Sequence, residues 1–193
     1  MNSDDHNNTL VQDPNITKEI SLKIFISIVS GAIGFWLSLH PFVFLLPPYE
    51  LKFIAGLVFP LVVSLEWGWR YGLLSAIIGL GAQVMWIKGG WESVVTYFLF
   101  VLWVVWHGWS AEKFRKTGKK IWHRYAVELP FRLFNTIILY TVYRWIFQLD
   151  LPPWAPEITQ TSVSLQYVNY MAFGAACNGY LVLLLSNVLI LFG

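Results

Sequence analysis

The stretch Phe59–Trp86 reads FPLVVSLEWGWRYGLLSAIIGLGAQVMW, and it decides how the rest of the chain is interpreted. Both of its halves are apolar enough for the interior of a bilayer, but its middle holds Glu66 and Arg70 among tryptophans, glycines and a tyrosine. Two helices joined by a tight turn at Gly68 explain this pattern, because glycine breaks a helix and charges gather where a span ends. The stretch therefore predicts two membrane spans, with the charged cluster at one membrane surface.

The composition of the whole chain points to the same class of protein. Its 193 residues are 56% hydrophobic and only 12% charged, and their mean hydropathy is +0.56. A soluble domain usually carries about twice this share of charge. Apolar runs of roughly 20 residues, the length that crosses ~30 Å of hydrocarbon as a helix, recur along the chain. We therefore expect an all-α, multi-pass integral membrane protein, in the form of a compact bundle.

Six transmembrane helices are predicted, separated by residues that favour turns. The predicted helices are 20–46, 51–67, 70–87, 92–109, 126–147 and 166–192. Pro47-Pro48 ends the first, Gly68 divides the second from the third, and Gly89-Gly90 divides the third from the fourth. A polar tail, 1–19, precedes a single transmembrane domain at 20–193. The last predicted helix has no basic residue after it, so we expect either a cytoplasmic domain to follow or a complete small subunit.

The orientation in the membrane follows from the loop 111–125, which holds six Lys and Arg residues against the single acid Glu112. Short loops rich in Lys and Arg remain in the cytoplasm. Both termini and the turn at Gly68 then lie inside, and the loop 148–165 lies outside. Under this topology nine of the 13 Lys and Arg lie at the inner ends of spans and three at the outer ends.

Two acid–base pairs are predicted at the inner membrane surface. Glu66 and Arg70 flank the tight turn, and Glu128 and Arg132 repeat the same spacing at the inner end of the fifth predicted helix. One interpretation is that headgroups and water solvate these charges, which then serve with neighbouring aromatic residues as anchors. The other is that they form a network of inner-face ion pairs that rearranges when the helices shift.

Polar residues within the predicted spans are the candidates for a ligand-binding site. Most of them lie in the outer half of the membrane under the predicted topology, which suggests an outward-opening pocket with aromatic walls and a few amides. The candidates are His40, Gln83, Trp86, Asn135, Tyr140, Tyr143, Asn169 and Asn178. We expect four of them, Gln83, Trp86, Tyr140 and Asn169, to line one cavity. The alternative is that the amides only tie helices together, at about 0.6 kcal/mol each.

Two predicted helices carry faces of small residues. In the first, Ser27 and Gly31 and then Ser30 and Gly34 recur at a spacing of four, and the third has a similar face from Gly72 to Ala82. Small residues let helices approach closely, either inside the bundle or against a partner protein. Trp103, Trp106 and His107 also share a helical face, which is more typical of packing than of a cofactor site.

No catalytic or metal-binding motif is present, so we expect no enzymatic activity, cofactor or metal site in this chain. The motifs HExxH and GxSxG and a glycine-rich phosphate loop are all missing from the sequence. His40 and His107 lie near opposite membrane surfaces under the predicted topology, and they could not ligate one metal or haem iron. The basic loop suits anionic lipid, and nucleic acid is not expected as a partner.

The stretch Phe59–Trp86, followed by LFVLWVVWHGW, resembles the N-terminal membrane module of bacterial receptors that carry PAS and histidine-kinase domains. The resemblance covers roughly residues 50–110 and rests on the run of Trp, Gly and Arg. In general architecture the chain is also similar to LytS-type sensor domains and to the substrate-binding subunits of energy-coupling-factor vitamin transporters. The resemblance implies a sensor in the bacterial inner membrane that detects a small ligand and signals to a cytoplasmic kinase or effector. A transporter subunit is the alternative.

Overall fold

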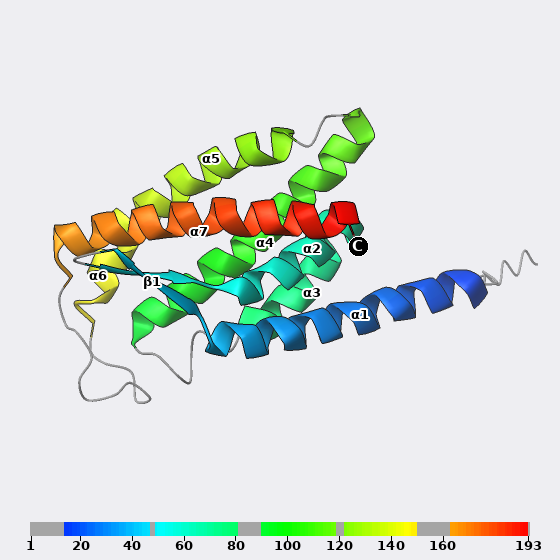
Figure 1. Ribbon diagram of the computed structural model, residues 1–193, viewed down its shortest axis with the longest axis horizontal. Coiled ribbons are helices and arrows are strands. Elements are labelled where there is room, and N and C mark those ends of the chain that lie inside the picture. Colours follow the sequence, from blue (N-terminus) through cyan, green and yellow to red (C-terminus); the bar gives the residue numbers. More distant parts are fainter. Residues whose placement is uncertain (1–13, 47–48, 81–89, 119–121, 150–162, 193) are drawn as a thin grey trace, which may run out of the picture.

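A computed structural model of the chain describes residues 14–46, 49–80, 90–118, 122–149 and 163–192. These residues are mostly helical, with one two-stranded sheet (Figure 1). In chain order the elements are α1 (Pro14–Leu39), β1 (Phe42–Leu46), β2 (Tyr49–Phe53), η1 (Ala55–Leu57), α2 (Val58–Trp67), α3 (Trp69–Leu80), α4 (Trp91–Thr117), α5 (Trp122–Ile138), η3 (Leu139–Tyr143), α6 (Arg144–Ile146) and α7 (Leu165–Phe192).

Three of the described helices are long and apolar enough to cross a membrane. They cover Asn15–Leu39, Trp91–Thr117 and Leu165–Phe192, or 25, 27 and 28 residues. These lengths exceed the ~20 residues needed to span the hydrocarbon core. The prediction of six spans therefore holds in part: the described residues contain three helices of this kind, accompanied by shorter helices and by α5, which carries three charged side chains.

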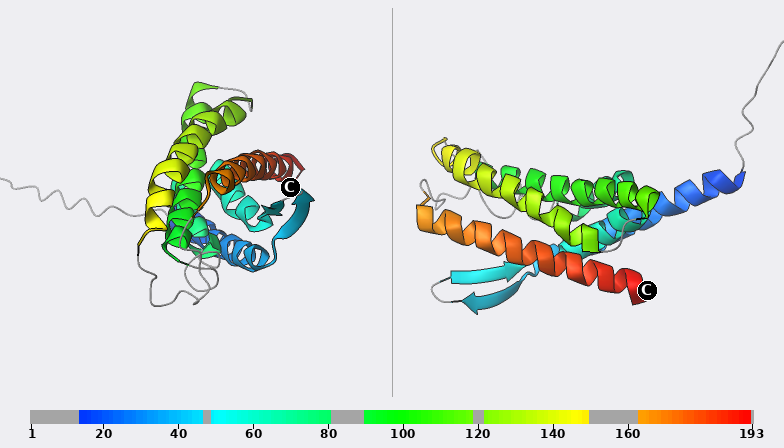
Figure 2. Two further views of the ribbon diagram at one scale, coloured as in Figure 1. Left: turned by 90° about the vertical axis from the view of Figure 1, so that its left-hand side faces the viewer. Right: turned by 90° about the horizontal axis from the view of Figure 1, so that it is seen from above.

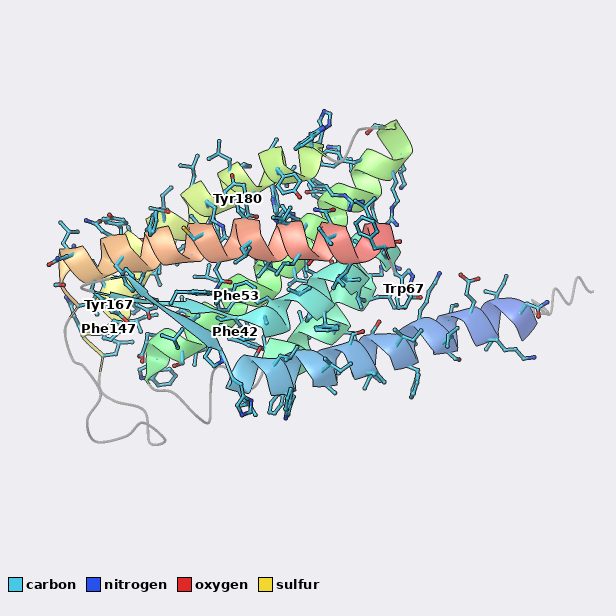
Figure 3. The ribbon with its side chains drawn as sticks, viewed as in Figure 1. Phe42, Phe53, Trp67, Phe147, Tyr167 and Tyr180 are labelled. Atoms are coloured by element: carbon cyan, nitrogen blue, oxygen red, sulfur yellow. The ribbon has the colours of Figure 1, made fainter. Side chains whose placement is uncertain are left out.

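The region between α1 and α2 differs from the prediction, which extended one helix to residue 46 and began the next at residue 51. Residues 42–46 and 49–53 instead form an antiparallel pair of strands, in which Phe42 pairs with Phe53 and Leu46 with Tyr49. Proline at 41 disfavours helical geometry in the residue before it, and the following Phe-Val-Phe is typical of a strand. The rings of Phe42 and Phe53 stack with centroids 6.4 Å apart (Figure 3).

The predicted helix break at Gly68 is confirmed. This glycine has φ +97°, a conformation that L side chains rarely adopt, and it separates α2 from α3 with no intervening loop. Its N–H donates to Ser64 O at 3.0 Å, and its carbonyl accepts from Gly72 N at 3.1 Å. The carboxylate of Glu112 on α4 accepts a hydrogen bond from the first backbone N–H of α3 at 3.2 Å, which caps that helix.

The small-residue faces of α1 and α3 pack against each other inside the molecule. A Cβ atom added at Gly31 would lie 2.8 Å from Ser75 O, and one added at Gly79 would lie 3.1 Å from Gly31 O. Gly34 approaches the backbone of Gly56 just as closely. The backbones of the two helices are therefore in near contact, which only small side chains allow.

The basic segment 111–125, predicted as a loop, is largely helical. Helix α4 continues to Thr117 and ends at Gly118, which has φ +64°, and α5 begins at Trp122. The stretch from Ala111 to Lys116 contains good helix formers and no breaker, so the helix runs on until the first glycine. At the start of the chain α1 begins at Pro14, so the end of the predicted polar tail 1–19 is helical as well.

The molecule has two distinct ends (Figures 1 and 3). One end holds the start of α1, the end of α7, the α2–α3 turn with Trp67, and the α4–α5 junction. The other holds the hairpin, the start of α4, α6 and the start of α7, with Phe147 and Tyr167. Viewed end-on, α4 and α5 form one flank and the hairpin lies on the opposite flank, with α7 between them (Figure 2). The segments predicted to share a membrane surface thus lie together.

The apolar core runs between α2, α3, α4 and α7, and large apolar side chains also cover the outside. Leu61, Leu65, Trp103, Val104 and Val182 are almost fully buried. Many Leu, Ile, Val and Phe side chains on α1, α4, α5 and α7 are 40% exposed or more. A soluble protein rarely exposes apolar surface on this scale, whereas a lipid-facing surface requires it.

Candidate functional site

A buried carboxylate at the centre of the bundle is the most unusual chemical feature of the structure. Glu128 on α5 is fully buried and forms an ion pair with Arg132 one helical turn later. Its other oxygen, Oε2, lies 2.7 Å from the indole Nε1 of Trp103 and 2.5 Å from Nε2 of His107, both on α4. We call these four residues the Glu128 cluster.

Two of the three partners of Glu128, Trp103 and Arg132, can only donate to its carboxyl group. The indole and guanidinium N–H groups can only donate, and His107 donates when Nε2 carries the proton. Burying a carboxylate is costly unless charge and hydrogen bonds compensate, and here one cation and two further donors do so. The guanidinium of Arg132 also lies over the Trp103 ring, 5.5 Å from its centroid.

Helix α7 closes over this cluster at Gly179. A Cβ atom added there would lie 2.5 Å from Cζ of Arg132, and closer still to Nη2 of Arg132 and to Oε1 of Glu128. Only glycine leaves room for the ion pair at this crossing. Three helices, α4, α5 and α7, therefore meet at the Glu128 cluster.

A small cavity borders the cluster between the same three helices. Its volume is about 50 Å³. It is lined by Thr96, Leu99, Phe100, Trp103, Phe131, Arg132, Asn135, Leu139, Met171 and Ala175. Most of this lining is apolar, and Arg132 and Asn135 supply its main polar groups.

The polar groups of this cavity have hydrogen-bonding capacity left over. Arg132 is 9% exposed and gives its Nε–H to Glu128, and no further hydrogen bond from its guanidinium is present within the described ranges. The amide of Asn135 is 6% exposed and likewise has no hydrogen-bond partner among the described residues. Buried polar groups are normally paired, so donors that face a cavity suit a water molecule or a polar ligand.

The ligand-site residues predicted from the sequence do not gather in one place. Tyr140 donates its hydroxyl hydrogen to the Asn169 side chain, and both residues are exposed on the outside of α5–η3 and α7. His40 is exposed at the end of α1, where a ring nitrogen lies 3.2 Å from Trp36 O. Gln83 and Trp86, which were expected to share a cavity with Tyr140 and Asn169, lie outside the described residues.

The remaining candidates are buried. Asn135 lines the cavity, while Tyr143 packs in a separate small apolar cluster with Leu139 and Val168. Oδ1 of Asn178 accepts a weak hydrogen bond of 3.5 Å from the backbone N–H of Ile54, the residue after the hairpin. Of the predicted ligand-site residues that the structure describes, Asn135 is therefore the one that lines the cavity beside the Glu128 cluster.

Of the two predicted inner-face ion pairs, one forms and is buried, and the other does not form among the described residues. Glu128 and Arg132 are paired, but they are buried in the bundle and not solvated at its surface. Glu66 and Arg70 are both exposed, and within the described ranges no ion pair joins them. Arg70 instead lies over the ring of Trp69, 5.5 Å from its centroid. The break at Gly68 places Glu66 and Arg70 on different helices, so the spacing of four residues does not bring them together.

Sequence reasoning missed the contributions of α4 and α7 to this site. The helical face of Trp103 and His107 was interpreted as packing, although a histidine and a tryptophan on one apolar helix could have been matched to the acid on α5. Nothing in the sequence marked Gly179 among the other small residues of α7. Within the described ranges no group of three or more His, Cys, Asp or Glu side chains could hold a metal ion.

Comparison of the chain with protein-family models, with curated proteins and with solved structures finds no match.

Proposed function

We propose that this chain is the membrane-embedded, ligand-binding input module of a bacterial signal-transduction receptor of the histidine-kinase type. In this proposal a small ligand binds in the cavity between α4, α5 and α7, and occupancy reaches a cytoplasmic effector through a change in helix packing. The observation that carries the proposal concerns Arg132, which lines the cavity and also holds the Glu128 cluster together. The chain itself has no catalytic role here, and a fused or partner kinase supplies the output.

The size and chemistry of the cavity limit the ligand. A volume of about 50 Å³ is a third of the ~150 Å³ cavity that accommodates benzene, so the ligand has only a few non-hydrogen atoms unless the helices move apart. The unused donors of Arg132 and the amide of Asn135 favour a hydrogen-bond acceptor, and a negative charge above all. A small carboxylate or inorganic oxyanion meets both requirements.

Coupling from the cavity to the ends of the bundle follows from the position of Arg132. A ligand shifts a conformational equilibrium only by its difference in affinity for the two states. An anion at the Arg132 guanidinium competes with Glu128 for the same charge within α5. It thereby disturbs the cluster through which α5 contacts Trp103 and His107 on α4 and Gly179 on α7. The ends of α4, α5 and α7 that lie together near the C-terminus would then be repositioned (Figure 1).

The alternative function, a substrate-binding subunit of a vitamin transporter, relied partly on the small-residue face of the first helix as a docking surface. That face is occupied in the structure by α3 and by Gly56, through Gly31 and Gly34. A cavity of about 50 Å³ is also well below the 300–1,000 Å³ typical of sites for larger ligands. Both observations favour the sensory role.

The membrane orientation in this proposal is that of the bacterial inner membrane with both termini in the cytoplasm. The end of the molecule that holds the α4–α5 junction carries Lys113, Arg115, Lys116 and Arg124. Lys and Arg at this density favour the cytoplasmic side. An effector attached after α7 would emerge at this same end.

The test uses the purified full chain in lipid nanodiscs, titrated with formate, acetate, nitrate and bicarbonate, with thermal stability as the readout. We expect at least one of these anions to raise the unfolding temperature, because binding to the folded state alone stabilises it. Asn135→Leu should abolish the shift while leaving Arg132 in place. The matched control is Asn169→Leu, which removes an exposed asparagine of α7 that does not line the cavity and should leave the shift unchanged.

The signalling half of the proposal is tested separately with a histidine-kinase module joined after Gly193. The anion that stabilises the chain should change autophosphorylation of the fusion, and Asn135→Leu should remove that response. If no anion stabilises the chain, or if Asn169→Leu matters as much as Asn135→Leu, the cavity holds structural water and the ligand proposal is wrong. Binding without any change in kinase activity would refute the sensory role alone.

A further inference from the structure

A second hollow lies on the outer surface of the bundle, where α4 and α5 cross. Its volume is about 390 Å³, and it is lined by Leu102, Trp106, Pro130, Phe131 and Phe134. Leu102 and Phe134 are more than 40% exposed, so the hollow opens to the surroundings of the protein. We call it the α4–α5 groove. It is separate from the small cavity beside Asn135, although Phe131 contributes to both walls.

The wall of this groove contains few polar groups. Pro130 has no N–H, and the indole N–H of Trp106 is used in a 3.1 Å hydrogen bond to the carbonyl of Val127. That bond holds α4 to α5 at the base of the groove. A surface of this kind binds hydrocarbon, because nothing in it requires water or a polar partner.

From the groove, a row of side chains leads along α4 to a positive charge. Leu102, Trp106, Trp109 and Lys113 follow each other at spacings of four, three and four residues, which places them on one face of the helix. The rings of Trp106 and Trp109 lie 5.8 Å apart, and Nζ of Lys113 lies 5.3 Å from the centroid of the Trp109 ring. Hydrocarbon surface, indole rings and an ammonium group thus follow in that order.

We infer that the α4–α5 groove binds one molecule of an anionic phospholipid, with an acyl chain against Trp106 and Pro130 and the phosphate headgroup at Lys113. The order of surfaces along α4 matches the order of chain, glycerol and phosphate in such a lipid. Indole rings favour the boundary between hydrocarbon and headgroups, which is where Trp109 would lie. Lys113 forms no ion pair with a carboxylate in the part of the chain that the structure describes, so its charge is available.

A zwitterionic lipid fits less well, because its headgroup has no net negative charge to offset the Lys113 ammonium. A basic side chain near a membrane surface favours anionic lipid by a factor of about five. The inference does not depend on a ligand in the inner cavity, since Phe131 is the one residue that the two linings share. Failure of the ligand proposal would leave it unaffected.

The test measures binding of phosphatidylglycerol and of phosphatidylcholine with identical acyl chains to the full chain in detergent, by native mass spectrometry. We expect one phosphatidylglycerol to bind about five-fold more tightly than phosphatidylcholine. Lys113→Gln should remove this preference. The matched control is Arg70→Gln, since Arg70 is also an exposed cation over a tryptophan ring at the same end of the bundle but borders no such groove. The preference of the Arg70→Gln variant for phosphatidylglycerol over phosphatidylcholine should change less than two-fold.

A third variant tests the hydrocarbon part of the site. Leu102→Trp fills the groove from its exposed rim and should weaken the binding of both lipids. Equal affinity of the wild-type chain for the two lipids would overturn the inference. An equal loss of the preference for phosphatidylglycerol in Arg70→Gln and Lys113→Gln would also overturn it. The preference would then result from the overall positive charge at this end of the bundle and not from Lys113. Unchanged lipid binding in Leu102→Trp would show that no acyl chain occupies the groove.

Discussion

Replacing Gly179 by alanine adds one methyl group at the point where α7 crosses the Glu128 cluster. The new Cβ would lie 2.5 Å from Cζ of Arg132 and still closer to Oε1 of Glu128. An ordinary contact needs at least 3.4 Å, so the guanidinium must withdraw by about 1 Å or α7 must move outward. That guanidinium also lies over the Trp103 ring, 5.5 Å from its centroid, which limits the directions in which it can retreat.

The size of the effect follows from opposing contributions. Alanine stabilises a helix interior by about 1 kcal/mol relative to glycine, so the substitution would be favourable in open space. Overpacking a buried site costs about 1–3 kcal/mol, and separating a buried ion pair costs about 3–5 kcal/mol. Because the methyl group crowds the pair without separating it fully, only part of the separation cost applies, and we expect a net loss of about 1–3 kcal/mol in the free energy of unfolding.

The assay is equilibrium unfolding of the purified chain in mixed micelles of a mild detergent and dodecyl sulfate, followed by tryptophan fluorescence. Gly179→Ala is measured alone and in a background that carries both Glu128→Ala and Arg132→Ala. Without those side chains the three atoms nearest to the methyl group are gone, and the substitution should become neutral or stabilise the chain by up to about 1 kcal/mol. A change of sign between the two backgrounds is therefore expected.

Two results would refute this reasoning. If Gly179→Ala does not lower the free energy of unfolding of the wild-type chain, α7 does not approach the Glu128 cluster as closely as the structure shows. If its cost is the same in both backgrounds, the clash involves groups other than Glu128 and Arg132.

Two further predictions concern the cluster and the orientation of the chain. Glu128→Gln should lower the free energy of unfolding by about 3–5 kcal/mol in the same assay, because an amide N–H₂ would face donors and Arg132 would lose its counter-charge. Stability equal to that of the wild type would mean that the carboxylate is protonated or solvated. In a Cys177→Ala background, a membrane-impermeant thiol reagent added outside intact cells should label Gln148→Cys and not Lys116→Cys; the opposite pattern would reverse the assigned topology.

Several features of the fold could be predicted because they depend on neighbouring residues along the chain. The helix break at Gly68 follows from the need for a positive φ, and the bounds of α7 differ from the prediction by one residue. The strand pair at 42–46 and 49–53 could not be predicted from hydropathy, since its apolar residues suit a span equally well and the pairing of Phe42 with Phe53 is a tertiary contact.

The fifth predicted helix, 126–147, shows where local periodicity stops being sufficient. A period of 3.6 residues placed Asn135, Tyr140 and Tyr143 on one face. The structure has a π-helical turn at Leu139–Tyr143, which has more residues per turn, so Leu139 and Tyr143 are buried and Tyr140 is exposed. Tyr140 therefore faces away from the cavity beside Asn135, and the apolar pattern does not reveal this.

By itself the sequence determined that the chain is rich in apolar helices, that α1 and α3 have faces on which another helix can pack closely, and that charges cluster near the α4–α5 junction. These properties depend on composition and on spacings within one helix. Only the tertiary structure decided that Glu128 meets His107 and Trp103 under Gly179. That contact depends on the rotation and axial offset of three helices relative to one another, and neither quantity is encoded in the periodicity of any single helix.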